Sequence, residues 1–434
     1  MKPADSVLPT PYWWDAAPVS TLPRVDLPRQ VDVVVIGEGY TGLSAAIRLA
    51  QAGRSVIVLD RQRSGEGAST RNGGITSGNI RPSYSELVST FGEARARGIV
   101  AEGKLAREDL RRFIEAEKID CDYRLTGRFR GAMTRDEYES GARQADELAK
   151  TLGIESYAVP QSEQHQYIGT TFYRGGDVRM DIGGLHPGKL HAGMLRVAIA
   201  AGVAIHDGTS MTAMTRSKAG FTIKTDRGDV LADKLLMCTN GYTDGADPWL
   251  RRRIVPVRSR IIATESIPQE LMDTLMPQRM MCGDNRALSY YYRPSPDGTR
   301  ILFGGRDGAN SEDVIAPTEH LRTELARIFP QLRDVRLTNS WFGFVAMHRD
   351  MIPRIFDHDG VLYATGCCGS GVVWARWLGT KVAERLLGAS DSERSAFDFR
   401  PPKFVPLFRG NAWFMPVVFA ALKRRDQKTM AGRD

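Results

Sequence analysis

The feature that most constrains the fold of this chain is a glycine turn between a strand and a helix near its start. The apolar run Val31-Asp-Val-Val-Val-Ile36 is typical of a buried strand, and Gly37-Glu-Gly39-Tyr-Thr-Gly42 follows it directly. Apolar residues then recur at helical spacing as far as Ala50. A lone G-x-G-x-x-G motif is weak evidence, but a strand before it and a helix after it predict a βαβ unit that binds a dinucleotide.

The residues of this turn have separate physical roles in such a unit. We expect Gly37 to allow the tight turn and Gly39 to let the backbone approach a pyrophosphate, while Gly42 lets the helix pack closely on the sheet. The first helical turn directs its free N–H groups at the phosphates. A second apolar strand ends in Asp60, whose carboxylate is placed to accept hydrogen bonds from a ribose.

Composition narrows the class of protein. The chain has 434 residues, 42% apolar and 25% charged, which is typical of a soluble globular protein large enough for two domains. Because it has neither an apolar run of about 18 residues nor a secretory signal, we expect no spanning helix and no export. Five widely spaced cysteines indicate free thiols in a reducing cytoplasm. The net charge of +8 favours an acidic partner only weakly, and nothing else indicates nucleic acid or a metal.

The order of patterns along the chain predicts an α/β fold with a second, α+β domain. We predict a Rossmann-like nucleotide-binding domain and a substrate domain built on a mainly antiparallel sheet. Aromatics in the leader, Pro11-Tyr-Trp-Trp14, are expected to dock on the body of the protein, with a role at the active-site mouth as the alternative. The boundaries that we assign are 1–30 for the leader, 31–85, 185–245 and 350–390 for the nucleotide domain, 86–184 and 246–349 for the substrate domain, and 391–434 for a tail.

Two further glycine loops indicate which dinucleotide is bound. A nicotinamide enzyme would normally continue from Asp60 with more alternating strands and helices, whereas this chain continues with Gly65-Glu-Gly67-Ala-Ser-Thr-Arg-Asn-Gly73-Gly74. A third loop, Gly366-Cys-Cys-Gly-Ser-Gly371, follows a final strand much later in the chain. Contacts from such widely separated segments suit FAD, whose flavin half extends away from the βαβ unit.

The motifs taken together resemble the D-amino acid oxidase, glycine oxidase and sarcosine oxidase superfamily of FAD-dependent amine oxidoreductases. Within it, the chain is most similar to the gamma-glutamylputrescine oxidase-like group. As a set, the matching segments are far more specific than any one of them. They occur in the family's order, and they are Asp32–Asp60, Gly67–Gly74, Leu185–Leu190, Cys238–Thr243, Tyr291–Pro294, Leu302–Arg306, Asp350–Pro353 and Tyr363–Gly371.

The resemblance implies both a reaction and a cofactor site. The reaction is oxidation of the C–N bond of a small amine or amino acid by hydride transfer to flavin N5, with oxygen as acceptor and hydrogen peroxide formed. The imine product then hydrolyses to a carbonyl compound. The implied FAD-binding residues are Gly37, Gly39, Tyr40, Thr41, Gly42, Asp60, Arg61, Ser69, Thr70, Arg71, Asn72, Gly73, Gly74, Thr239, Asn240, Gly241, Gly366, Gly369, Ser370, Gly371 and Val372.

Two departures from sarcosine oxidases affect these expectations. Those enzymes tether the flavin through a cysteine, and this chain has Gly343 at the aligned position, so we predict non-covalent FAD. They also place a lysine near the flavin to speed its reaction with oxygen, and this chain has Leu302 at about that point. The second departure leaves open whether oxygen or another acceptor, such as quinone, reoxidises the flavin.

The substrate pocket is expected among the middle strands. The candidates for catalysis are Tyr291, Trp341, His348 and Arg306, accompanied by Tyr290, Tyr292 and Phe344, because aromatic rings hold alkyl amines by shape and cation–π contact. The three consecutive tyrosines cannot all face one way on a strand. For His348 the alternative is a structural role, and for Arg306 it is pairing with a nearby acid instead of a substrate carboxylate or phosphonate.

Two alternatives to the leading prediction stay open at the level of sequence. The same fold also suits an amine dehydrogenase that passes electrons to quinone or another acceptor. A non-catalytic FAD-binding or tRNA-modifying flavoprotein is an alternative of another class. The tail, Phe404–Arg425, has an apolar run ended by cations, so it either packs on the protein as a terminal helix or contacts a membrane.

Overall fold

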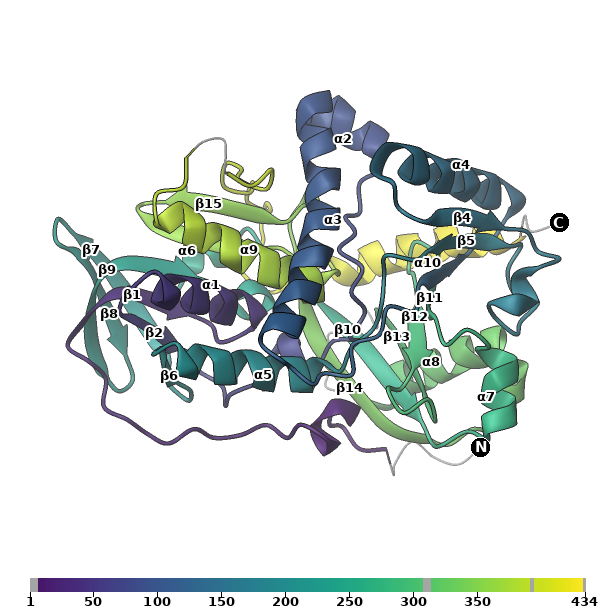
Figure 1. The fold of residues 1–434 in the computed structure, drawn as a ribbon, viewed down its shortest axis with the longest axis horizontal. Coiled ribbons are helices and arrows are strands. Elements are labelled where there is room, and N and C mark those ends of the chain that lie inside the picture. The colour runs from purple at the N-terminus through teal and green to yellow at the C-terminus, as the bar shows by residue number, and fades with distance from the viewer. Residues whose placement is uncertain (1–6, 307–313, 391–393, 432–434) are drawn as a thin grey trace.

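Two eight-stranded sheets lie side by side and form the body of the protein (Figure 1). The structure is a computed structural model that describes residues 7–306, 314–390 and 394–431. The remaining residues, which belong to the predicted leader, substrate domain and tail, lie outside the described residues. This mixed α/β architecture with a second, mainly antiparallel sheet is the predicted fold class, while the predicted domain boundaries stay predictions.

The first sheet has a parallel centre. Its path runs β15-β16-β9-β1-β2-β6, and only β15 and the β7–β8 hairpin run antiparallel to their neighbours. Val34 and Val35 are both fully buried although they point to opposite faces, which explains why β1 is an unbroken apolar run. The strands are β1 (Gln30–Ile36), β2 (Val56–Leu59), β6 (Ala204–His206), β7 (Met211–Ser217), β8 (Gly220–Thr225), β9 (Gly228–Met237), β15 (Arg354–His358) and β16 (Val361–Thr365).

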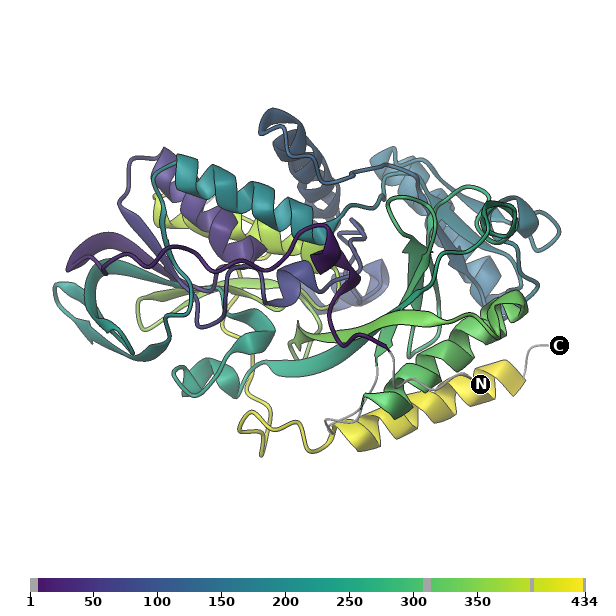
Figure 2. The same cartoon turned by 90° about the horizontal axis from the view of Figure 1, so that it is seen from below.

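Three helices cover one face of this sheet, as Figure 2 shows from the side. They are α1 (Tyr40–Gln51), α5 (Pro187–Ala200) and α9 (Gly371–Leu386), and the long α3 (Glu93–Ala116) packs outside α9. Leu43, Leu190 and Val373 join one apolar core beneath them. The opposite face is buried by the β7–β8 hairpin and by the short α6 (Pro248–Arg251).

The second sheet is antiparallel except where β11 pairs with β3. Its order is β14-β10-β13-β12-β11-β3-β5-β4, so strands far apart in the sequence lie side by side. These strands are β3 (Arg128–Gly131), β4 (Ser156–Val159), β5 (Gly176–Arg179), β10 (Val255–Thr264), β11 (Met281–Asp284), β12 (Tyr291–Pro294), β13 (Ile301–Arg306) and β14 (Leu337–Met347). The other helices of this half are α4 (Arg135–Leu152), α7 (Gln269–Leu275) and α8 (Ile315–Ile328). In contrast, α2 (Tyr84–Phe91) packs on α3 and on the core of the first sheet.

The leader is a strap that joins the two sheets. Leu8 pairs with β14 of the second sheet through backbone hydrogen bonds to Thr338 and Ser340. The chain then makes a short 3-10 turn, Tyr12–Asp15, and runs across to the first sheet, where it continues into β1 (Figure 2). On the way the amide of Leu22 donates to the carboxylate of Asp207 at 3.3 Å.

The tail forms a helix at the edge of the second sheet. This helix, α10 (Met415–Ala431), lies beside α8 in Figure 2. Met415 and Phe419 pack against a small apolar cluster, and Met430 packs against the core of the second sheet. None of the described helices is both long enough and apolar enough to cross a membrane.

The contact between α1 and α9 generates a stability prediction. A methyl group on Gly379 of α9 would overlap the carbonyl oxygen of Thr41 in α1 and would lie 2.9 Å from Ser44 Cβ. We expect Gly379→Ala to lower the free energy of unfolding by about 1–3 kcal/mol, measured by chemical denaturation, because the two helices must separate.

A matched control uses the same substitution in another helix. A methyl group on Gly98 of α3 would meet only Ala396 Cβ, at 3.4 Å, which is ordinary contact. Gly98→Ala should therefore leave stability unchanged or raise it by about 0.5–1 kcal/mol. Equal unfolding free energies for Gly379→Ala and the parent would show that the helices do not depend on this glycine.

Candidate active site

A cavity opens where the carboxyl ends of three parallel strands face the second sheet. Its void, counted to the open mouth, is about 1220 Å³. Residues just after β1, β2 and β9 line it, and the N-termini of α1 and α9 face it. Ligands bind at this edge of parallel sheets because the helices that follow the strands begin there.

The first glycine turn forms one wall of the cavity. Gly37 has φ +104°, and a methyl group on Gly42 would overlap the carbonyl oxygen of Gly37, so the turn and the helix touch through backbone alone. Among the described residues, the N–H groups of Thr41 and Gly42 have no hydrogen-bond acceptor. These two donors at a positive helix end make an anion site.

Asp60 lies beside this turn with its carboxylate already oriented. Its Oδ2 accepts from the amide of Glu38 at 2.8 Å, and its Oδ1 accepts from the amide of Gln62 at 2.9 Å. Burial raises the pKa of Asp60, and the two amides oppose that shift. Each oxygen keeps a further lone pair for a ribose hydroxyl.

Glu38, inside the turn, was not predicted to have a role. Its carboxyl is buried, accepts a hydrogen bond from Ser64 Oγ at 2.7 Å and lies 3.4 Å from His191 Nε2. Burial raises the pKa of Glu38 to about 8 and lowers that of His191 to about 4, so both are mainly neutral at pH 7. A neutral carboxyl avoids placing a buried negative charge beside the anion site. The sequence signal for this role was the position of Glu38, an acidic residue between two glycines of the turn.

The second glycine loop is held by three indole N–H groups. Trp13 Nε1 donates to the carbonyl of Asn72 at 2.8 Å, and Trp341 Nε1 donates to the carbonyl of Arg71 at 2.8 Å. Trp14 Nε1 donates to Thr70 Oγ1 at 2.9 Å. The leader therefore positions the loop, a more specific role than the docking that the sequence predicted.

The third glycine loop precedes α9 at the far end of the cavity. Asn240 Oδ1 accepts from the amide of Gly366 at 2.9 Å and ties this loop to the chain after β9. A methyl group on Gly366 would overlap the ring of His348, whose Nδ1 lies 2.9 Å from the carbonyl of Ile352. The structure thus places His348 behind the loop, where burial lowers its pKa to about 4.

The three consecutive tyrosines point in alternating directions. Tyr290 and Tyr292 join the core of the second sheet. Tyr291 points the other way, and methyl groups built on Gly304 or Gly73 would clash with its ring. Its hydroxyl lies 3.0 Å from Ser259 Oγ, and burial raises its pKa, so it stays protonated. One tyrosine of the three therefore faces the second glycine loop.

Two guanidinium groups lie near the third loop. Arg306 Nη2 is 3.7 Å from the position of a methyl group on Gly369, and its Nη1 lies 3.5 Å from Met347 Sδ. Burial lowers the pKa of Arg306, and the charge of Arg81 lowers it further. Within the described parts of the chain, neither arginine pairs with a carboxylate. Arg81 was not predicted, because it stands in a loop without a motif.

The predicted cofactor residues divide into two groups in the structure. Those that line the cavity are Gly37, Gly39, Tyr40, Thr41, Asp60, Arg61, Ser69, Asn72, Thr239, Asn240, Gly369 and Gly371. The others are absent from its lining, and they are Gly42, Thr70, Arg71, Gly73, Gly74, Gly241, Gly366, Ser370 and Val372. Of the substrate candidates, Phe344 lines this cavity. Tyr291 and Trp341 contact the second glycine loop, and His348 and Arg306 lie beside the third.

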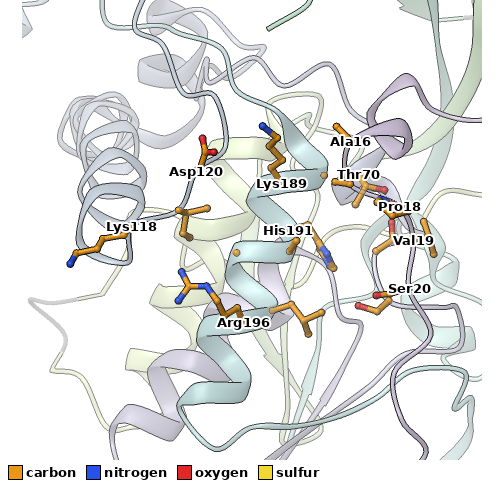
Figure 3. A pocket seen from close by; sticks show the side chains of 18 residues that line it. Ala16, Pro18, Val19, Ser20, Thr70, Lys118, Asp120, Lys189, His191 and Arg196 are labelled. Carbon is orange, nitrogen blue, oxygen red and sulfur yellow. Dashed lines mark hydrogen bonds between the residues drawn. The ribbon is translucent and has the colours of Figure 1, made fainter. Parts of the chain in front are cut away.

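A second hollow, shown in Figure 3, lies on the outer side of the second loop. Leader residues 16–20 cross α5 there, and a methyl group on Gly188 would lie 2.9 Å from Ala17 Cβ. His191 points to the leader side of α5, while Lys118 and Arg196 lie on the opposite side. Gly188 thus gives the strap room to pass close to α5.

The cavity combines the features of a dinucleotide site. A ribose acceptor, free helix N–H groups and a third loop at the far end follow one another along it. This arrangement at the carboxyl ends of a parallel sheet, opposite an antiparallel sheet, is typical of oxidoreductases that bind a dinucleotide. The chain belongs to the DAO family, described as FAD dependent oxidoreductase, whose profile matches residues 32–385. The family resemblance inferred from the motifs is confirmed.

Individual relatives extend over most of the chain. A probable oxidoreductase OrdL from Rhizobium meliloti (strain 1021) is 29% identical, and the alignment spans 95% of this chain and 96% of the relative. The gamma-glutamylputrescine oxidoreductase of Escherichia coli (strain K12) is 28% identical over 84% of each. The crystal structure of glycine oxidase from Geobacillus kaustophilus matches with a TM-score of 0.73 at 19% identity, covering 87% of this chain and 100% of that one.

The indole contacts of the strap generate a prediction for cofactor binding. Trp13→Phe keeps an aromatic side chain and removes the hydrogen bond to the Asn72 carbonyl, which is worth about 0.5–1.5 kcal/mol. We expect the dissociation constant for FAD, measured by titrating the apoprotein, to rise roughly 2- to 12-fold because the loop loses its position.

Trp377→Phe is the matched control. It also removes an indole hydrogen bond, from Nε1 to Glu102 at 2.7 Å, but on the outer side of α9. FAD affinity should be unchanged in this variant. Equal losses in both variants would assign the effect of Trp13 to general stability.

Proposed function

We propose that this protein oxidises the C–N bond of a small amino acid or other amine that carries an acidic group, with non-covalently bound FAD. The observation that carries the proposal is the pair of guanidinium groups, Arg81 and Arg306, without a carboxylate partner among the described residues. Arg306 is partly buried and Arg81 is exposed, and a guanidinium shielded from water is stabilised by an anion beside it. A substrate carboxylate, or a phosphonate of similar geometry, supplies that partner.

The cofactor would lie along the cavity in one direction. The free amides of Thr41 and Gly42 would hold the pyrophosphate, and Asp60 would hold the adenosine ribose. The N-terminus of α9 would stabilise negative charge on the reduced ring. Bound FAD supplies the acceptor for the hydride that leaves the α-carbon of the substrate.

The chain's own residues prepare the substrate. Arg81 and Arg306 bind the acidic group and so fix the distance of the amine from the third loop. The same two positive charges disfavour an ammonium ion nearby, which lowers the pKa of the substrate amine and frees its lone pair. The ring of Tyr291, held by Ser259, restricts water between the second loop and β13. When hydride leaves, the product is an imine that water cleaves to a carbonyl compound and an amine.

His348 and Trp341 act in this proposal as positioning residues. His348 supports the Gly366 turn from behind, and Trp341 holds the Arg71 carbonyl. Neither touches the substrate. This differs from the expectation that both belong to the catalytic group, and it follows from where their polar atoms lie.

Non-covalent binding is supported by the state of the thiols. Cys367 and Cys238 line the cavity, and burial raises their pKa values, to about 12 for Cys367. A protonated thiol is a poor nucleophile toward the flavin ring. Gly343, at the tether position of sarcosine oxidases, lies against Arg71 instead. The free, buried thiols also support the proposed cytoplasmic location.

Oxygen is the proposed electron acceptor, with peroxide as product. The charges of Arg81 and Arg306 near the third loop favour reduction of oxygen, because negative charge builds on it. Transfer to quinone is the alternative, and the exposed apolar and cationic surface of the tail favours it. Peroxide release on admitting air to the reduced protein separates the two.

The experiment that tests the reaction is anaerobic bleaching of the flavin. Amino acids, N-methyl amino acids, aminophosphonates and plain polyamines are added to the holoprotein, and we expect amines with an acidic group near the reacting carbon to bleach it. Arg306→Met should weaken the binding of such substrates by roughly 10- to 150-fold, because a charge-assisted hydrogen bond is worth about 1.5–3 kcal/mol.

Arg336→Met is the control, because Arg336 is exposed at the start of β14 and pairs with Glu265. This control variant should bind every substrate as the parent protein does. Failure of all amines to bleach the flavin would favour a non-catalytic flavoprotein. Equal weakening of acidic and plain amines by Arg306→Met would show that the arginine does not recognise the acidic group.

A further inference from the structure

The tail exposes an apolar surface that the reaction does not use. Five large apolar side chains between residues 404 and 418 are exposed: Phe404, Leu407, Trp413, Val417 and Val418, with exposed fractions of 50%, 85%, 57%, 71% and 39%. The described chain has only eight other exposed side chains of this kind, and they are spread over several elements. Scattered exposed apolar residues are normal, but a contiguous group marks a contact site.

The same segment has a one-sided charge. From Phe399 to Arg425 the chain contains no aspartate or glutamate. Its cations are all exposed, and they are Arg400, Lys403, Arg409, Lys423, Arg424 and Arg425. The partner that covers this surface must therefore have both an apolar interior and negative charge at its surface.

The orientation of α10 is set by contacts on its inner side. Met415 and Phe419 pack inward, and Asp426 accepts hydrogen bonds from the amides of Ala287 and Leu288 at 2.7 and 3.0 Å. These positions are spaced by four and seven residues, so they mark one face of the helix. The opposite face is exposed, is apolar in its first turns and is basic in its later turns; it consists of Val417, Ala420, Ala421, Arg424 and Lys428.

We propose that this tail surface, residues 400–428, docks on an anionic lipid membrane. An apolar strip flanked by exposed lysines and arginines is the pattern of a helix that lies at the membrane interface. Figure 2 shows α10 and the loop before it along the same lower edge of the molecule, outside α8. Trp413 and Leu407 would enter the headgroup boundary, while the cations meet lipid phosphates.

A second copy of the chain fits this surface less well. In a two-fold dimer the same patch faces itself, so the cations of one protomer would meet those of the other. No carboxylate between Phe399 and Arg425 is available to separate them. Anionic headgroups remove that repulsion and accept the apolar side chains as well.

The test is binding of the holoprotein to lipid vesicles, measured by sedimentation. We expect binding to vesicles of phosphatidylcholine with phosphatidylglycerol, little binding to pure phosphatidylcholine, and release at high salt. Replacing Lys423, Arg424 and Arg425 together by glutamine should lower the partition coefficient roughly a hundredfold, at about fivefold for each cation. The same change at Arg111, Arg112 and Lys118, which alters net charge equally on another face, should have little effect.

The apolar contribution is tested separately. Leu407→Ser combined with Val417→Ser should weaken binding at least about tenfold, whereas Leu125→Ser with Leu231→Ser, exposed on other elements, should not. An unchanged flavin spectrum confirms that each variant is folded. The assay is independent of the proposed reaction, because it uses the resting protein.

Two results would overturn the proposal. One is that the parent does not bind anionic vesicles, or that both tail variants bind them as well as the parent does. The other is a concentration-dependent dimer, seen by analytical ultracentrifugation, that dissociates in Leu407→Ser with Val417→Ser while no vesicles are bound. In that case a second copy of the chain covers the surface.

Discussion

The close packing of α1 on the turn that ends β1 is the constraint on which the rest of the site depends. A methyl group on Gly42 would overlap the carbonyl oxygen of Gly37, and one on Gly379 would overlap that of Thr41. Three segments of the chain therefore touch through backbone alone, and the N-termini of α1 and α9 reach one cavity. Their N–H groups and dipoles make both ends of that cavity favourable for negative charge.

The nucleotide half of the protein was predictable because its signals are local. The run before Gly37 and the carboxylate at Asp60 identify strand ends without knowledge of the rest of the fold. The short strands β4, β5 and β11 were not predicted, since each is four residues long and depends on distant partners, as β11 does on β3. Tertiary pairing decides such segments, and their own residues do not.

The same contrast applies to the site. Arg306 and Tyr291 lie in motif segments and were predicted as site residues from the sequence, whereas Arg81 and the pairing of leader indoles with the second loop were not. Trp13 and Asn72 are 59 residues apart, and only the folded chain brings an indole N–H to that carbonyl. Glu38 carried a signal, because a carboxylic acid beside a pyrophosphate turn must be neutral or paired, and burial keeps it neutral.

The most direct test of the site is a crystal structure of the FAD-bound protein with an unreactive analogue of an amino acid. We expect the adenosine ribose at Asp60, the pyrophosphate at the amides of Thr41 and Gly42, and the flavin ring near Gly369 and Gly371. The analogue's carboxylate should contact Arg306 or Arg81. A flavin ring at the Asp60 end of the cavity, or a carboxylate bound away from both arginines, would contradict this account.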